Sequence, residues 1–128
     1  IQTGFSVAEI VISPEPVLYS GIVKPDIAAI IAPEGKAKIA RLTKAMEETD
    51  TIYFADGLGD IDSDANIQPL DFPESAHKDL RKNISALTAG YLAKELKLFP
   101  FEALKEAVRK IQRPKIAEIN LGVFAHFE

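Results

Sequence analysis

The chain has 128 residues, 47% of them hydrophobic and 27% charged, which is the profile of one globular domain with a core of ordinary size. Its 15 basic and 19 acidic residues are scattered and give a net charge of −4, so a nucleic acid or an anionic membrane is disfavoured as a partner. Cysteine is absent, which excludes disulfides, zinc thiolate sites, iron–sulfur ligation and a cysteine nucleophile within this chain.

The first part of the chain is expected to contain one strand and one loop. Residues 5–12 are rich in β-branched and apolar side chains interrupted by Glu9, which predicts a strand with one partly wet face or an edge position. Pro14 and Pro16 lack the N–H that a ladder needs, so residues 13–25 are predicted to form a loop with extended pieces.

The next segment has the order strand, helix, strand. Residues 26–32 are a short continuous apolar run, typical of a strand buried on both faces, and residues 51–55 are a second one. Between them, residues 33–48 place four apolar side chains on one face of a helix: Ile39, Leu42, Ala45 and Met46. The short connections imply a right-handed crossover and a parallel pair of strands.

The rest of the chain is predicted to be mainly helical. Residues 66–72 form a final short strand weakened by Pro69, and helical patterns follow within residues 82–100, 100–111 and 115–127. The inward side chains of the second helix are expected to be Leu104, Val108 and Ile111. The fold class is therefore α/β: a single three-layer α/β/α domain over residues 1–128, with a small, mostly parallel or mixed sheet, helices on both faces and a helical C-terminal third.

The helical pattern of residues 82–100 carries two adjacent stripes, one bulky and one small. The small stripe consists of Ser85, Ala86, Ala89, Gly90 and Ala93. Small side chains let another backbone approach closely, so we expect the bulky stripe to pack on the sheet and the small stripe to meet a neighbouring helix or a partner. For a domain of this size, the first expectation is that both surfaces are internal.

An acidic stretch at residues 56–71 has part of the spacing of a calcium-binding loop. The pattern starts at Asp60, but Ala65 stands where the loop needs glycine and Asp71 stands where it needs a bidentate glutamate. We interpret the stretch as a solvated acidic turn.

Two other sites in this stretch are also incomplete. Gly57 and Gly59 follow a strand and match half of a dinucleotide fingerprint, but Asp62 occupies the position of the third glycine. Asp56 ends the strand as a phosphoacceptor does, but no earlier strand supplies an adjacent pair of acids for magnesium. A turn or capping role is the simpler interpretation.

No catalytic or metal-binding residue emerges from the remaining sequence. His77 and His126 are expected at the surface, with no carboxylate or nucleophile at a telling distance. The sequence contains no G-x-S-x-G elbow, H-E-x-x-H helix or P-loop. Asn83 lies near the start of a helical pattern and is expected to cap it.

Four segments nevertheless resemble a known family. They are residues 4–17 (GFSVAEIVISPEPV), 23–35 (VKPDIAAIIAPEG), 81–110 (RKNISALTAGYLAKELKLFPFEALKEAVRK) and 116–127 (IAEINLGVFAHF). Together they resemble the gamma subunit or gamma domain of the 2-oxoacid:ferredoxin oxidoreductases, which include the pyruvate, 2-oxoglutarate and indolepyruvate enzymes. The family has an Asn-containing helix of small residues, a Pro-Glu-Ala-Leu-type helix and a terminal Asn-Leu segment. The matching positions are Asn83, Ala86, Ala89 and Gly90, then residues 99–104, then Asn120 and Leu121.

The resemblance implies a non-catalytic subunit of a cytoplasmic enzyme complex. Such complexes decarboxylate a 2-oxoacid with thiamine diphosphate, pass electrons through iron–sulfur clusters to ferredoxin, and usually form an acyl-CoA. These cofactors lie mainly on the other subunits (alpha, beta, delta or their fused equivalents), so this chain is expected to bind none of them alone. The residues expected to contact partners are Gly4, Phe5, Ser6, Tyr19, Ser20, Asn83, Ala86 and Gly90.

The chain departs from the family at its start. Family members open with a strand, a Gly-rich turn and a helix, and then an Arg-Gly-Gly-like segment. Of this, only Thr3, Gly4 and Ser6 have counterparts here. Since no methionine precedes Ile1, we expect the sequence to begin inside a longer natural chain.

Two alternatives from other classes remain open. The first is a freestanding binding or signalling module with flavodoxin-like topology, which binds magnesium, a nucleotide or a flavin by itself. The second is a complete enzyme whose active-site residues do not form a recognisable motif.

Overall fold

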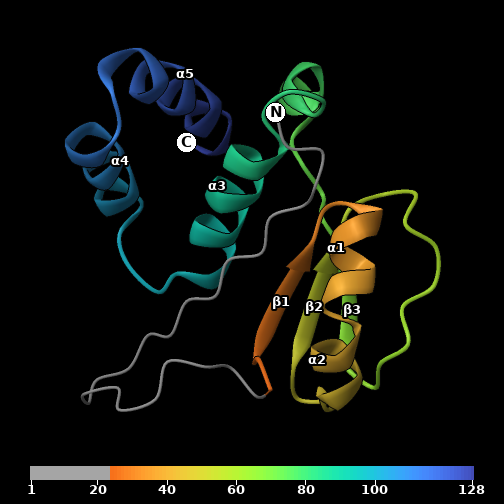
Figure 1. Ribbon diagram of the computed structural model, residues 1–128. Helices are drawn as coiled ribbons and strands as arrows, with labels where there is room; N and C mark the ends of the chain where they lie inside the picture. Colours follow the sequence, from red (N-terminus) through yellow and green to blue (C-terminus); the bar gives the residue numbers. More distant parts are fainter. Residues whose placement is uncertain (1–23) are drawn as a thin grey trace. The chain divides into compact units, whose positions relative to one another are not determined.

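The computed structural model describes residues 24–128. The described residues form two compact units, one that ends at Pro69 and one over Leu70–Glu128. The first unit holds a parallel sheet and the second is helical (Figure 1). The expected α/β class with a helical C-terminal part is therefore confirmed.

The described part of the first unit is a strand–helix–strand motif extended by a third strand. The strands are β1 (Ile27–Ile30), β2 (Thr51–Phe54) and β3 (Asn66–Pro69), and the helices are α1 (Pro33–Lys38) and α2 (Ala40–Ala45). The sheet order is β1-β2-β3 and both pairs are parallel. Pro69 is tolerated because it is the last residue of β3, which among the strands of residues 24–128 pairs with β2 alone.

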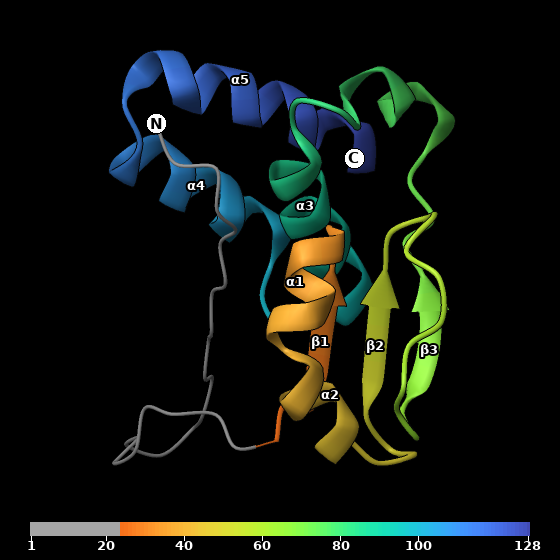
Figure 2. The same ribbon diagram turned by 45° about the vertical axis from the view of Figure 1, so that its right-hand side comes forward.

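The core of this unit lies between the sheet and its two helices. Ala28, Ile30 and Ile52 point from the strands to Met46, which follows α2 and is 2% exposed. Alternate residues of a strand point to opposite faces, and these three share one face because Ala28 pairs with Ile52. Figures 1 and 2 show α1 and α2 along this sheet.

The predicted helix over residues 33–48 is broken. Ile39 has φ −101° and ψ 15°, which separates α1 from α2, and its side chain packs on the sheet core. After this break Thr43 is buried and Ala45 is exposed, so the inward position predicted for Ala45 is wrong. A single helical period continued across residue 39 misplaces the inward face of α2, because the backbone at Ile39 interrupts that period.

The entry to β2 is held by a buried carboxylate. Asp50 accepts hydrogen bonds from the Glu47 N–H and from Lys24 Nζ, both at 2.7 Å, and its side chain is 4% exposed. The N–H of Glu47 and the ammonium of Lys24 lower the pKa of Asp50 below its ordinary value, so it stays ionised where it is buried.

The second unit consists of three helices with a short 3-10 turn at each end. Its elements are η1 (Glu74–Asp79), α3 (Ile84–Leu96), α4 (Phe101–Ile111), α5 (Pro114–Phe124) and η2 (Ala125–Phe127). One core joins η1, α3 and α5 through Ala76, Leu87 and Val123, and another joins α4 to α5 through Val108 and Phe124.

The inward face of α4 is shorter than the sequence predicts. Val108 is 7% exposed and Leu104 packs against it as expected, but Ile111 is 82% exposed. The chain turns at Gln112 and Pro114 begins α5, so the last turn of α4 extends past the core. The inward position predicted for Ile111 is therefore wrong.

Ile52→Ala is expected to lower the free energy of unfolding of the first unit by about 2–5 kcal/mol, because it leaves a cavity in a fully buried position. Ile67, its register neighbour on β3, is 36% exposed and supplies a matched control. Ile67→Ala should cost clearly less. Denaturant unfolding followed by circular dichroism compares the two, and equal losses would contradict this assignment of the core.

Candidate functional site

An open groove in the second unit is the strongest candidate site. It has a volume of about 400 Å³ and lies between the start of α3, the inner face of α4 and the middle of α5. Its lining residues are Lys82, Asn83, Ser85, Ala86, Ala89, Leu104, Val108, Gln112, Asn120 and Phe124. Amide and hydroxyl groups line this groove together with small and apolar side chains, as in surfaces that receive another polypeptide or a small ligand.

The groove brings together residues that are far apart in the sequence. Asn83, Ala86, Ala89, Leu104 and Asn120 all line it, and all belong to the segments that resemble the oxidoreductase gamma subunits. Asn120 Nδ2 donates to Gln112 Oε1 at 2.8 Å, which fixes the side chains at the α5 wall. Helical periodicity within α3 predicts that Ala86 and Ala89 share one face. It does not predict that Asn120 of α5 lines the same groove.

Asn83 does not cap α3 with its side chain. It occupies the N-cap position, but its side chain makes no capping hydrogen bond; Nδ2 instead donates to Asp79 Oδ1 at 3.4 Å. The predicted capping role is therefore wrong. The competing acceptor, Asp79, belongs to η1, which precedes the helix that the sequence pattern predicts.

Gly90 is covered by aromatic rings of the same unit. A Cβ at this position would lie 2.7 Å from Phe127 Cε2 and 3.3 Å from Phe124 Cδ1. At Gly90, therefore, it is the chain's own phenylalanine rings, and not a partner, that pack closely against the small stripe. Ala86 and Asn83 line the groove, and their contact with a partner stays a prediction.

His126 is not the isolated surface residue that the sequence indicated. Its Nδ1 lies 3.0 Å from Ser75 Oγ, and its Nε2 lies 2.9 Å from Asp79 Oδ2. The Asp79 carboxylate can only accept, so Nε2–H donates to it; Nδ1 then accepts from the Ser75 hydroxyl in the neutral imidazole and donates to Ser75 Oγ in the imidazolium. Sequence reasoning missed this set because 47 residues separate Asp79 from His126.

The order hydroxyl, imidazole, carboxylate is also the order used by acyl-transfer enzymes. Here it joins η1 to η2 across the unit, and neither of the two grooves described in this section is lined by Ser75 or His126. We therefore interpret the set as a polar link that fixes the C-terminal turn. His77, by contrast, is exposed as expected.

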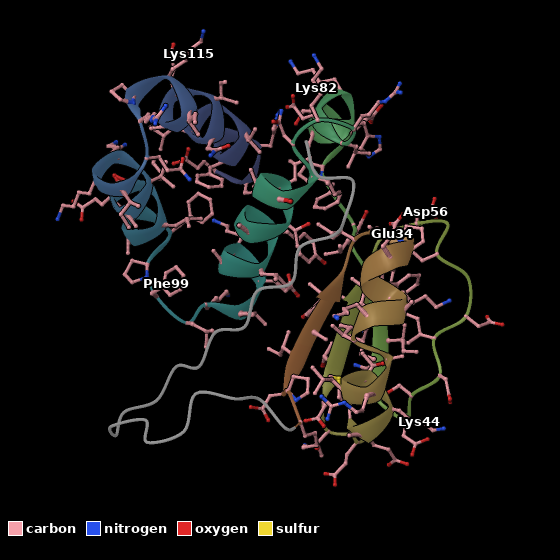
Figure 3. The ribbon with its side chains drawn as sticks, in the orientation of Figure 1. Glu34, Lys44, Asp56, Lys82, Phe99 and Lys115 are labelled. Atoms are coloured by element: carbon pink, nitrogen blue, oxygen red, sulfur yellow. The ribbon has the colours of Figure 1, made fainter. Side chains whose placement is uncertain are left out.

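A second open groove, of about 550 Å³, lies at the connection between α3 and α4. It is lined by Ala93, Lys94, Lys97, Leu98, Phe99, Pro100 and Phe101. Leu98 is 58% exposed and Phe99 is 40% exposed, and Figure 3 shows Phe99 at this connection. Lys97 has φ 53°, a left-handed conformation that ends α3 and turns the chain toward Pro100.

The acidic turn of the first unit is tied to the helices. Lys36 Nζ donates to the Leu58 carbonyl at 2.8 Å, and Ser63 Oγ donates to the Thr43 carbonyl. Gly57 and Gly59 have φ values of 83° and 75°, which glycine adopts without strain, so both serve the turn.

Within residues 24–128, no group of three or more His, Asp or Glu side chains is placed to hold a metal ion. None of the helices in that range has both the length and the apolar character needed to span a bilayer. Five residues that we expect to contact partners, Gly4, Phe5, Ser6, Tyr19 and Ser20, lie outside the described residues.

Comparisons with protein-family models, with curated proteins and with solved structures found no match to this chain.

Gly90→Ala is expected to lower the free energy of unfolding of the second unit by about 1 kcal/mol. Overpacking against the two phenylalanine rings costs about 1–3 kcal/mol, and the helix preference of alanine offsets up to about 1 kcal/mol of that cost. Gly122 in α5 is the matched control, since a Cβ there would meet no atom within 4 Å. Gly122→Ala should stabilise the unit, and a stabilising Gly90→Ala would show that the rings do not cover α3.

The link between Asp79 and His126 should make stability depend on pH. The hydrogen bond from His126 lowers the pKa of Asp79 below its ordinary value of 3.8, so the carboxylate stabilises the folded unit above that value. This contribution should be lost as the pH falls through the lower pKa of the folded state. Thermal unfolding across acid pH should show a steeper loss in the wild type than in Asp79→Asn. Identical slopes would mean that this link does not stabilise the fold.

Proposed function

We propose that this chain is the non-catalytic gamma subunit or domain of a cytoplasmic, multisubunit 2-oxoacid:ferredoxin oxidoreductase. In this assignment the other subunits supply thiamine diphosphate and the iron–sulfur clusters. The absence of cysteine from the sequence agrees with that division, because this chain offers no thiolate to a cluster. Its own role is to dock against those subunits and hold their arrangement.

One observation carries the proposal. The positions that match the family's helical motifs are dispersed between residues 83 and 121, yet five of them line a single groove. The groove is open, and its lining includes Ala86 and Ala89 of α3, Asn83 at the N-cap of α3 and Asn120 of α5. Small lining residues admit a side chain or a backbone segment from a partner, and the two amides offer hydrogen bonds to its peptide groups.

The assignment can be tested with the natural protein, tagged and purified from its own cells. We expect it to co-purify with subunits that bind thiamine diphosphate and iron–sulfur clusters. The complex should reduce an artificial dye with a 2-oxoacid and coenzyme A, whereas the chain alone should not.

Two exposed alanines make the role of the groove testable. Ala89→Leu places a bulky side chain in the groove, and Ala107→Leu makes the same change at an exposed position of α4 that does not line it. Co-purification should be lost only with Ala89→Leu. Turnover of a 2-oxoacid by the isolated chain would overturn the proposal, and binding of a flavin, a nucleotide or magnesium by the chain alone would favour the freestanding module.

A further inference from the structure

In the second unit, α4 and α5 each carry an apolar stripe whose side chains are buried at one end of the helix and exposed at the other. On α5, Ile116, Ile119 and Val123 follow each other at helical spacing. Val123 is 3% exposed and packs with the core of η1 and α3, whereas Ile116 and Ile119 are 48% and 50% exposed. On α4, the inward stripe ends in Ile111, which is 82% exposed.

The exposed ends of the two stripes lie on either side of the turn between the two helices. α4 ends at Ile111 and α5 begins at Pro114, so all three isoleucines lie within nine residues of chain that turn once (Figure 2). Gln112, in the middle of this turn, also lines the groove described above. We call Ile111, Ile116 and Ile119, together with the charged residues around them, the corner patch.

The charge around these isoleucines is opposite to that of the whole chain. Residues 109–119 contain four cations, Arg109, Lys110, Arg113 and Lys115, and one anion, Glu118, which is +3. The chain carries −4, so the remaining residues sum to −7. Among the described residues, the side chains of Lys110, Arg113 and Lys115 have no hydrogen-bond or ion-pair partner, and Figure 3 shows Lys115 pointing away from α5.

We infer that the corner patch is a docking surface for one subunit of the oxidoreductase complex. The surface of that subunit that binds the patch is apolar at its centre and bordered by carboxylates. The inference rests on the proposed function, in which the chain is a subunit. Exposed isoleucines that are flanked along the chain by unpaired cations have the composition of a protein interface, in which apolar residues are bordered by charged ones. Carboxylates on the partner complement the local +3 and increase the association rate.

A protein fits the patch better than a nucleic acid or a membrane. Nucleic-acid sites carry a basic field over the domain, whereas this chain is net acidic. Helices that lie on membranes present one continuous apolar face with aromatic or leucine side chains, whereas the three isoleucines span a corner between two helices.

The test uses the complex obtained by co-purification. A carbodiimide cross-linker joins lysine amines to carboxylates that touch them, so cross-links from Lys110 or Lys115 to acidic residues of a partner subunit are expected in the wild type. The double variant Arg113→Glu, Lys115→Glu should weaken assembly at least about tenfold in dissociation constant. The control is Arg41→Glu, Lys44→Glu on α2 of the first unit, which has the same change in net charge and should assemble normally.

The outcomes separate this inference from the proposed function. If the complex assembles, but no such cross-links form and both double variants behave alike, the docking surface is wrong while the proposed function stands. If no oxidoreductase subunit co-purifies, both are overturned. The purified chain can also be tested for binding to phosphatidylserine vesicles and for dimerisation in sedimentation experiments. Either activity contradicts the inference if the Arg113→Glu, Lys115→Glu variant abolishes it and the Arg41→Glu, Lys44→Glu variant does not.

Discussion

The arrangement of the helical unit depends on the missing side chain at Gly90. Because this residue has no Cβ, the rings of Phe124 and Phe127 lie directly against α3 at distances that an alanine would not permit. This contact fixes the C-terminal end of α5 on α3. Since a helix is rigid over its length, the position of its other end follows, and so do the wall of the groove and the bare isoleucines of the corner patch.

Polar contacts hold the C-terminal turn in place over this glycine. His126 is fixed between Ser75 and Asp79, and Glu128 pairs with Lys105 of α4 at 2.5 Å. These contacts come from η1 and α4, on either side of Phe127. The Phe127 ring stays packed against the α3 backbone only if the C-terminal turn is held in place. The contacts of His126 and Glu128 provide that restraint. The same link explains why a histidine near the end of the chain is largely buried, with 14% of its side chain exposed.

The first unit illustrates how much of a small α/β fold local pattern can predict. The strands at residues 27–30 and 51–54, their parallel pairing and the helical crossover follow from apolar runs separated by a one-faced segment. The break at Ile39 does not follow, because either one long helix or two short ones satisfies the same spacing. Packing of the Ile39 side chain on the sheet distinguishes them, and that contact exists only after the sheet has formed.

By itself, the sequence determined the element types of the described residues and the small stripe on α3, because these depend on neighbours within a few residues. The short connections between the apolar runs determined the parallel pairing of β1 and β2. Only the tertiary structure decided which small residue is covered, since Gly90 meets rings from residues 124 and 127 while Ala89 lines an open groove. The tertiary structure also determines that His126 contacts Asp79 and that the Ile111 side chain is exposed. These outcomes depend on where one helix ends relative to another, and helical periodicity carries no information on the relative placement of helices.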